Sequence, residues 1–489
     1  MSAMSLRFRL SWPLVVGALA FIPALRAPKG ILGDPDTYFH VVVGRWIMEH
    51  GGLPTVDPFS HTLAGAAWRT HEWLGEVVLA ILYGLGGWRT LVLLTASCFA
   101  ISAALLTRRL LRQSEPLLAV TLSLIAINLF LPHLLVRPHV LVLPILIAFC
   151  GALFAARDEG RGPPWRALPL ILLWANIHGS FAFGLGLAVC LGLEAIAKPS
   201  PGQRRIDEAR RWALFVLAAA ALTLATPNGI GGYVPVIHMM EVPIAQTYIA
   251  EWQSTNFGHF DPLELWLLGP ILLSFSTGIR LPDSRLLLVL ALIHLALVHT
   301  RHADLVAFVA PLAVVGALGP QLAERMHRGG LSRVGEAMAR LAPPVPWPTI
   351  ATASVAGLLL AYAEMPRPIE RANDVITPTA ALDAAQRLGL KGPVFNSQAF
   401  GGYLIFRGVP VFGDGRLEMY GNDFLTEYFA ASSGREPALS DLLDRYHVTW
   451  ALLMPGEGAV AALDHRPGWH RVYADKWAVV LARTDAGGP

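Results

Sequence analysis

Long apolar blocks alternate with short polar segments over most of the chain. Eleven of these blocks approach or reach the length of about 20 apolar residues that a helix needs to cross a bilayer. They lie at residues 10–26, 88–107, 117–134, 139–156, 166–177, 180–197, 212–226, 263–279, 285–299, 303–320 and 347–364. This pattern predicts a multi-pass α-helical membrane protein with about 11 transmembrane helices. The blocks at 166–177 and 180–197 could also form one bent hairpin, so about ten to twelve helices fit the pattern.

A polar segment, residues 27–87, follows the first apolar block and contains two shorter helical patterns. The first, residues 37–50, follows the helix-start signal Asp34-Pro35 and is too short to span a bilayer. Its apolar stripe lies opposite a face that carries Thr37, His40 and Gly44. The second, residues 71–87, must also stay outside, because the RRLLR run that follows the next block would otherwise change sides. We therefore predict two helices that lie along the outer membrane surface.

The pattern changes after Glu364, where short alternating runs replace the long apolar blocks. Five runs predict strands, at residues 393–397, 409–414, 449–455, 470–475 and 477–483. Two amphipathic runs, at residues 381–390 and 438–446, predict helices. We therefore expect a membrane domain over residues 1–365 and a small C-terminal α/β domain over residues 366–489.

Arginine and lysine are distributed unevenly between alternate loops. If the N-terminus is inside, the inner segments hold 19 of the 38 cations and the outer loops before the last span hold seven. The positive-inside rule then places the N-terminus in the cytoplasm and residues 366–489 on the outer side. The first block could instead be a signal peptide, but the following loop would still emerge outside. Abundant Ala, Gly and Arg with only four lysines are typical of a high-GC bacterial genome. We therefore expect the bacterial inner membrane as the location, with residues 366–489 in the periplasm.

Composition excludes several other classes of protein. With 54% hydrophobic and 15% charged residues, the chain is too apolar for a soluble globular protein. Its three cysteines lie inside apolar blocks without metal-ligand spacing, so we expect neither a disulfide framework nor a zinc site. The net charge is only +3 and there is no basic run with interleaved aromatic residues, so nothing supports nucleic-acid binding.

The stretches GDPDTYFHVVVGRWI and HEWLGEVVLAILYGLGG, within this arrangement of helices, resemble the GT-C superfamily of membrane glycosyltransferases. The likeness is to bacterial members near the oligosaccharyltransferase and lipid-linked-sugar transferase branches, and extends to VRPHV, LWANIHGSF, TPNGI and VFGDGRLEMY. The chain lacks a WWDYG-like acceptor motif, so the resemblance does not extend to transfer onto Asn-X-Ser/Thr sequons.

The resemblance implies an enzyme that moves a sugar from a polyprenyl-phosphate donor to an envelope acceptor on the outer face of the membrane. Its partners would be that donor and the membrane lipids. The chemistry needs a base for the acceptor proton and positive charge for the leaving phosphate. The resemblance assigns the base to Asp36, with Asp34 as the second choice, although both could serve only to start the helix. A divalent cation such as Mg²⁺ or Mn²⁺ could bind Asp34 and Asp36 with His40 or Glu72.

Further polar residues map to the outer face and are candidates for substrate binding. They are His40, His71, Glu72, Arg137, His139, Asn176, His178, Arg301 and His302. Arg137 and Arg301 are the candidates for the donor phosphate, since arginine suits a phosphate in a low-dielectric setting. Each of these residues also has a structural interpretation, such as helix-end anchoring or hydrogen bonding to backbone. Glu76 is expected on a solvated face, and Asp414 and Arg416 are expected to form an internal ion pair in a turn.

Two other functions remain open from the sequence. A transporter or flippase for a lipid-linked or polar substrate should carry polar groups at mid-membrane depth in both halves of the chain. Here eleven of the 16 histidines fall on the outer side, which favours an enzyme. A non-catalytic envelope assembly protein would need no carboxylate at the start of the loop.

Overall fold

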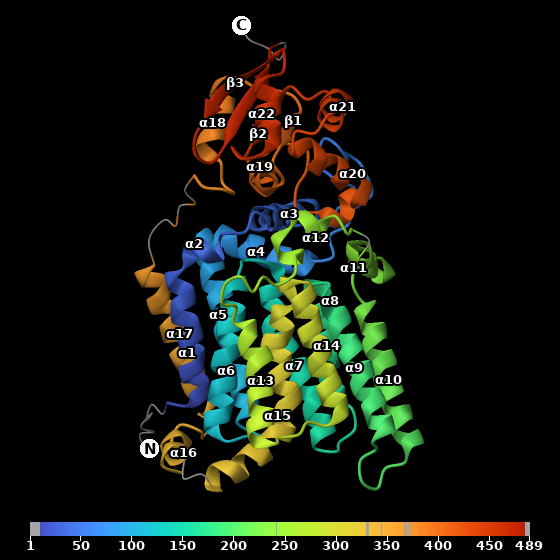
Figure 1. Ribbon diagram of the computed structural model, residues 1–489, viewed down its shortest axis with the longest axis vertical. Helices are drawn as coiled ribbons and strands as arrows, with labels where there is room; N and C mark the ends of the chain where they lie inside the picture. The colour runs from blue at the N-terminus through green and yellow to red at the C-terminus, as the bar shows by residue number, and fades with distance from the viewer. Residues whose placement is uncertain are drawn as a thin grey trace.

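The computed structural model is mostly helical and consists of a helical bundle with a smaller sheet-containing region at one end (Figure 1). It describes residues 10–484 except 241, 329–331, 344, 366–368, 370 and 372. We call residues 379–483 the sheet region. The end of the bundle next to this region is the sheet end, and the opposite end is the far end.

Every apolar block predicted as a helix is helical. The bundle contains α1 (Trp12–Arg26), α5 (Trp88–Leu110), α6 (Pro116–Phe130), α7 (Pro138–Asp158), α8 (Leu168–Ile177), α9 (Phe181–Ala197), α10 (Arg205–Thr223), α13 (Leu263–Thr277), α14 (Asp283–Val298), α15 (Ala303–Arg328) and α17 (Trp347–Glu364). Short helices join them, namely α2 (Pro28–Ile31), α11 (Val234–Met240), α12 (Ala245–Tyr248) and α16 (Ser332–Ala339). The blocks around His178 form two separate helices, α8 and α9.

The bundle combines a dense interior with apolar outer surfaces. Among the described residues, four helices are both long and apolar enough to cross a membrane: Trp88–Leu110, Pro116–His133, Pro138–Asp158 and Thr300–Arg325. Shorter apolar helices pack beside them. Helix α13 exposes Leu272 and Phe275, the latter by 90%. Large apolar side chains that face outward in this way are typical of helices surrounded by lipid.

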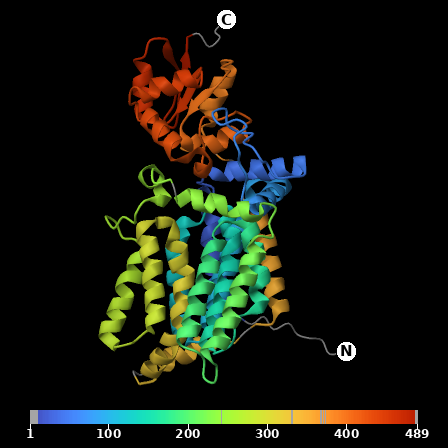
Figure 2. The ribbon, with the colours of Figure 1, turned by 90° about the vertical axis from the view of Figure 1, so that its right-hand side faces the viewer.

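Two helices lie between the bundle and the sheet region, α3 (Asp36–His50) and α4 (Trp73–Gly86) (Figure 2). Both were predicted, and the face of α3 opposite its apolar stripe is buried. Thr37 and His40 are buried, and Thr37 donates a hydrogen bond to the carbonyl of Val136 at 2.9 Å. Gly44 lies so close to α4 that a Cβ atom would overlap the carbonyl of Glu76. The reason is that α4 covers the polar face while the sheet region covers the apolar one.

The sheet region has four strands in the order β1-β2-β4-β3. They are β1 (Val394–Asn396), β2 (Trp450–Leu453), β3 (Trp469–Ala474) and β4 (Val479–Arg483); β1 and β2 are parallel and the other pairs antiparallel. The helices are α18 (Thr379–Arg387), α19 (Gly401–Phe406), α20 (Leu417–Ser432), α21 (Ala438–Arg445) and α22 (Gly458–Asp464). Four predicted strands and both predicted helices are present. The strand predicted at 409–414 is wrong, because Val411 bonds to Phe59 and His61 of the first loop instead of the sheet.

A buried ion-pair network ties the sheet region to the first loop. Arg416 pairs with Asp414 at 2.6 Å, as the sequence predicted, and also with Asp57 of the loop. Its guanidinium group lies over the rings of Phe39, Phe59 and Trp68. Two carboxylates and the surrounding aromatic rings compensate the buried positive charge of this arginine. The network therefore fixes the sheet region on α3.

Candidate active site

Loops that are far apart in the sequence meet at the sheet end of the bundle. Asp34 and Asp36 lie at the start of α3, and Arg137 immediately precedes α7. Glu251 lies in the 3-10 helix η4 (Ala250–Trp252), and Arg301 lies in η5 (Thr300–His302). We call these five residues the acid–arginine cluster. The three segments predicted to handle the proton and the phosphate therefore converge, and Glu251 joins them.

The guanidinium group of Arg137 lies between three carboxylates. Its Nε and Nη2 atoms donate to the two oxygens of Asp34, the Nη2 bond measuring 2.9 Å. Nη1 donates to both oxygens of Glu251 at 3.1 and 2.9 Å, and Nη2 lies 3.1 Å from Asp36 Oδ2. Burial alone would lower the pKa of Arg137, but the carboxylates raise it well above its usual value. Arg137 is therefore a permanent cation that contacts five carboxylate oxygens.

The two aspartates of the DPD stretch differ in their surroundings. The side chain of Asp34 is fully buried, and its Oδ1 also accepts a hydrogen bond from the backbone N–H of Asp36 at 3.0 Å. The side chain of Asp36 is 23% exposed and contacts Arg137 through one oxygen. Desolvation raises the pKa of Asp36 to about 7, against the lowering effect of Arg137. Asp36 can therefore exchange a proton near neutral pH, whereas Asp34 holds the arginine and the helix start.

The backbone of the sheet region lies against Asp36. A Cβ atom at Gly415 would overlap Asp36 Oδ1, so only glycine fits at this position without a shift of the carboxylate. Gly415 lies between Asp414 and Arg416, whose ion pairs fix the turn. The turn 413–416 thus forms one wall of the acid–arginine cluster.

Arg301 has looser contacts than Arg137. It lies 3.8 Å from Glu251 Oε1 and stacks over the ring of Trp252 at 4.4 Å. Within the described part of the chain its side chain donates no hydrogen bond that meets the usual geometry. Burial raises the pKa of Glu251, but Arg137 and Arg301 outweigh this effect and hold it at about 2. Glu251 is therefore a permanent anion shared by both arginines.

A second group of titratable residues lies beside the first, between α3, α4 and the α8–α9 turn. His40 Nδ1 lies 3.3 Å from Glu76 Oε1 and 3.7 Å from Glu72 Oε2. Glu72 Oε1 lies 3.1 Å from His178 Nε2 and 3.8 Å from His71 Nε2. We call these five residues the histidine–glutamate cluster. Burial lowers the pKa of His40, but the two glutamates more than offset this and raise it to about 9. Burial raises the pKa of Glu72 to about 7.

Glu76 was expected on a solvated face, and this prediction is wrong. Its side chain is buried, and it accepts a hydrogen bond from Thr70 Oγ1 at 2.7 Å as well as contacting His40. The cause is again the close packing of α3 on α4, which covers the face that carries Glu76.

Two of the four residues predicted as metal ligands, His40 and Glu72, belong to the group that could hold a metal. Ligand atoms of His40, Glu72 and Glu76 all lie within 4.8 Å of one another, and among the described residues this is the one group of at least three such side chains so arranged. Asp34 and Asp36, the other two predicted ligands, instead face Arg137. Because the guanidinium group occupies the space between their oxygens, these two residues do not fit a metal site.

Three predicted site residues lie outside the two clusters or at their edge. The side-chain oxygen of Asn176 accepts a bond from Trp73 Nε1 at 3.0 Å, and its Nδ2 donates to the carbonyl of Leu172. The ring of His302 lies 3.4 Å from the carbonyl of Leu295. The ring of His139 lies 6.1 Å from that of His178, at the edge of the histidine–glutamate cluster.

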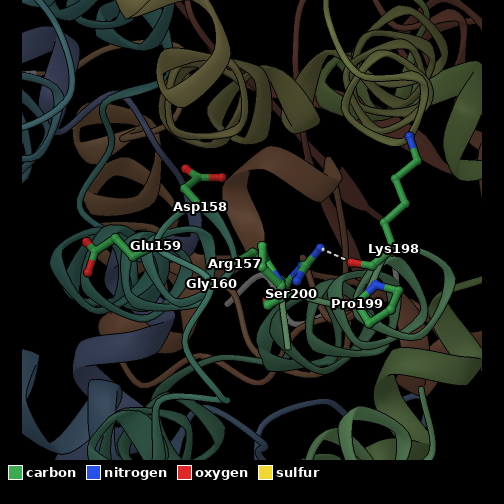
Figure 3. Close-up of a pocket in the computed structure, with 8 residues that line it drawn as sticks. Arg157, Asp158, Glu159, Gly160, Lys198, Pro199 and Ser200 are labelled. Atoms are coloured by element: carbon green, nitrogen blue, oxygen red, sulfur yellow. Dashed lines mark hydrogen bonds between the residues drawn. The ribbon is translucent and has the colours of Figure 1, made fainter. Parts of the chain in front are cut away.

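The far end of the bundle carries a pocket of about 380 Å³ (Figure 3). It is lined by Arg157, Asp158, Glu159, Gly160, Lys198, Pro199, Ser200 and Pro201. Arg157 donates a hydrogen bond to the carbonyl of Lys198 at 3.1 Å across it. None of the site residues predicted from the sequence lines this pocket, and its helix ends, α7 and α9, lie opposite the sheet region in Figure 1.

Neither a protein-family model nor a curated protein matches the sequence. Solved structures do match. The Archaeoglobus fulgidus oligosaccharyltransferase AglB, in complex with an inhibitory peptide and a dolichol-phosphate, is 13% identical with a TM-score of 0.55, over 98% of this chain and 75% of that chain. ArnT from Cupriavidus metallidurans bound to undecaprenyl phosphate is 15% identical with a TM-score of 0.51, over 98% and 99%. The A. fulgidus enzyme in complex with Zn and sulfate is 14% identical with a TM-score of 0.51, over 96% and 73%.

These neighbours match almost the whole chain, with the bundle and the sheet region included, at an identity too low to compare individual residues. They confirm the resemblance seen in the sequence at the level of the fold. The chain shares its overall fold with these solved structures of AglB and ArnT.

Proposed function

We propose that the protein is a GT-C-type glycosyltransferase that moves a sugar from a polyprenyl-phosphate-linked donor to an envelope acceptor on the outer face of the membrane. The observation that carries the proposal is the partly exposed carboxylate of Asp36, with a pKa of about 7, beside Arg137, while Arg301 joins the same cluster through Glu251. A base of this pKa and a nearby cation are the two parts that glycosyl transfer from a phosphate needs.

Asp36 is the proposed general base. It accepts the proton of the acceptor hydroxyl or amide as that atom attacks the anomeric carbon of the sugar. The bond between the anomeric carbon and the phosphate oxygen breaks, and the polyprenyl phosphate leaves with the electron pair. A single displacement of this kind inverts the configuration at the anomeric carbon. Asp34 assists by holding Arg137 and the start of α3, which together orient the Asp36 carboxylate.

Arg301 is the proposed ligand of the donor phosphate. Arg137 contacts five carboxylate oxygens, whereas Arg301 makes one long ion pair and is 29% exposed. Arg301→Ala should therefore weaken donor binding on the order of tenfold, the effect of a lost charge-assisted hydrogen bond. The matched control is Arg45→Ala, since Arg45 is an exposed arginine on the same side, on α3. Titration with a purified polyprenyl-phosphate sugar measures both affinities. Equal donor affinities for the two variants would show that Arg301 anchors the helix end and does not bind the phosphate.

The exposed members of the histidine–glutamate cluster are proposed to contact the acceptor or the sugar. The side chains of His71, Glu72 and His178 are 24, 13 and 16% exposed. Glu76 is buried and His40 nearly so, and these two residues hold α3 on α4. We propose that the first three side chains reach the substrate and that the other two support them.

We further propose that the bundle is a membrane domain of the bacterial inner membrane over residues 1–365, and that residues 366–489 form a periplasmic domain. The excess of cations at the far-end loops and the exposed apolar residues of α13 support this orientation. Reporter fusions after Ala363 and after Arg112 should show opposite sidedness. Matching sidedness would contradict the topology and, with it, the outer location of the site.

The decisive test combines cells and purified protein. Cells that lack the gene should accumulate a polyprenyl-phosphate sugar, and mass spectrometry of the lipid extract would identify the donor. Purified protein should convert that lipid and an envelope acceptor to free polyprenyl phosphate and a glycoside. A transporter or flippase would move the lipid between leaflets of a vesicle without consuming it, and that result would overturn the proposal.

A further inference from the structure

We infer that Arg137 is the resident cation of the Asp34–Asp36–Glu251 site, in the place where a divalent metal ion would otherwise hold these carboxylates, so that this site works without a metal. Only the catalytic part of this inference, that the site works without a metal, rests on the proposed function. Its structural content, that Arg137 excludes a metal from three converging carboxylates, stands by itself.

The first argument is the use of the carboxylate oxygens. Both oxygens of Asp34 and both of Glu251 accept hydrogen bonds from Arg137, and one oxygen of Asp36 lies 3.1 Å from its Nη2. A hard divalent ion needs about six oxygens within about 2.0–2.6 Å of one point. The planar guanidinium group spreads the same oxygens around its rim instead. The two cations therefore compete for one space.

The second argument is charge. With every group ionised, the acid–arginine cluster carries a net charge of −1, because three carboxylates face two guanidinium groups. This balance leaves little attraction for a second positive ion. Without Arg137 the net charge would become −2 around an open space, which is the condition for divalent-cation binding.

The third argument is that the backbone around Arg137 is anchored. The backbone N–H of Val136 donates to the carbonyl of Ile31 at 3.0 Å, and the carbonyl of Val136 accepts from Thr37 at 2.9 Å. Pro138 starts α7 directly after Arg137. These contacts hold the backbone on both sides of Arg137. The guanidinium group is therefore a fixed part of the site, as the carboxylates are.

The test measures Mn²⁺ binding to the purified full-length protein by electron paramagnetic resonance. All variants carry Glu76→Gln, which removes a ligand from the separate His40–Glu72–Glu76 group. In this background Arg137→Ala should gain one Mn²⁺ site, and Arg137→Ala with Asp34→Asn should lose it. The matched control is Arg301→Ala, which should gain none, because Arg301 contacts a single carboxylate of the cluster.

Several outcomes would overturn the inference. One is a Mn²⁺ site in the Glu76→Gln protein that disappears on adding Asp34→Asn. Another is a folded Arg137→Ala variant, with the elution volume of the parent, that binds no Mn²⁺. If Arg137→Ala does not fold, Arg137→Gln serves in its place with the same expectation, since the amide fills part of the space without charge. Mn²⁺ binding is measured without substrate. A protein that transferred no sugar would therefore refute the proposed function but would not change the outcome of the Mn²⁺-binding test.

Discussion

Arginines pair with several carboxylates at both ends of the bundle, and the comparison distinguishes a candidate site from a structural ion-pair network. At the far end Arg285 contacts Asp158 at 2.9 Å and Glu194 at 3.1 Å, and Arg157 also contacts Glu194 at 3.2 Å. These four residues belong to α7, α9 and α14, and their charges balance. The sheet-end residues lie in loops and helix starts, and their carboxylates outnumber their arginines.

The difference has a physical consequence. A balanced network between helix ends fixes the helices and leaves no group that must change its charge. An excess carboxylate that is partly exposed and partly desolvated titrates near neutral pH, as Asp36 does. The number of charged residues therefore does not distinguish the two ends. The excess of carboxylates over arginines, and the position of these residues on loops, does distinguish them.

The largest expected effect is at Asp36. Asp36→Asn should lower turnover by on the order of 10²-fold or more, the usual contribution of a general base, because an amide cannot accept the proton. Turnover with purified donor is the measurement, and the thermal midpoint in detergent shows that the variant is folded. Asp34→Asn is the matched control and should be milder, since Asn still starts a helix. If only Asp34→Asn is inactive, the two roles are reversed; if both variants are active, the sheet-end cluster is a scaffold too.

The next effect concerns the wall of the site. In Gly415→Ala the new methyl group would overlap Asp36 Oδ1, so the carboxylate or the turn must shift. A misplacement of about 1 Å can cost up to about 10²-fold in rate, and we expect a loss between tenfold and that limit. Gly456→Ala in the sheet region is the control, because a Cβ atom there meets nothing within 4 Å. Equal turnover of the two variants would show that the sheet region covers Asp36 without positioning it.

These two positions also show the limits of prediction from the sequence. The apolar blocks and the Asp34-Pro35 helix start are local signals, so the helices and the position of Asp36 were predictable. Gly415 meets Asp36 only because the sheet region docks on α3, and no local pattern contains that contact. The same holds for Glu251, which reaches Arg137 through a long loop, and for Glu76, which α3 covers. Val411 has the pattern of a strand, but the pattern does not reveal that its partner is the first loop.

A smaller effect is expected from pH. The base must be ionised, so turnover should rise with pH through about 7, the pKa of Asp36. Between pH 8 and pH 6 the ionised fraction falls about tenfold, and turnover at saturating donor should fall with it. Replacing Asp36 by Glu should move the midpoint while keeping a single rising limb. A profile that is flat over this range, or one that falls toward pH 8, would contradict the assignment of Asp36 as the base.

The smallest effect on turnover is expected at the far end. Arg285→Met should remove the buried partner of Asp158 and lower stability by about 1.5–3 kcal/mol, the usual range for a hydrogen bond between charged groups, because Asp158 itself is partly exposed. Turnover per folded molecule should change less than about twofold, because the balanced network supplies no proton and contacts no substrate in the proposed mechanism. The thermal midpoint in detergent measures the first quantity, and the transfer rate divided by the folded fraction measures the second. Arg285→Met with Asp158→Asn should recover part of the stability, since the second change removes the uncompensated charge. If Arg285→Met instead keeps its thermal midpoint and loses as much turnover as Asp36→Asn, the far-end network takes part in the reaction and the distinction between the two ends fails.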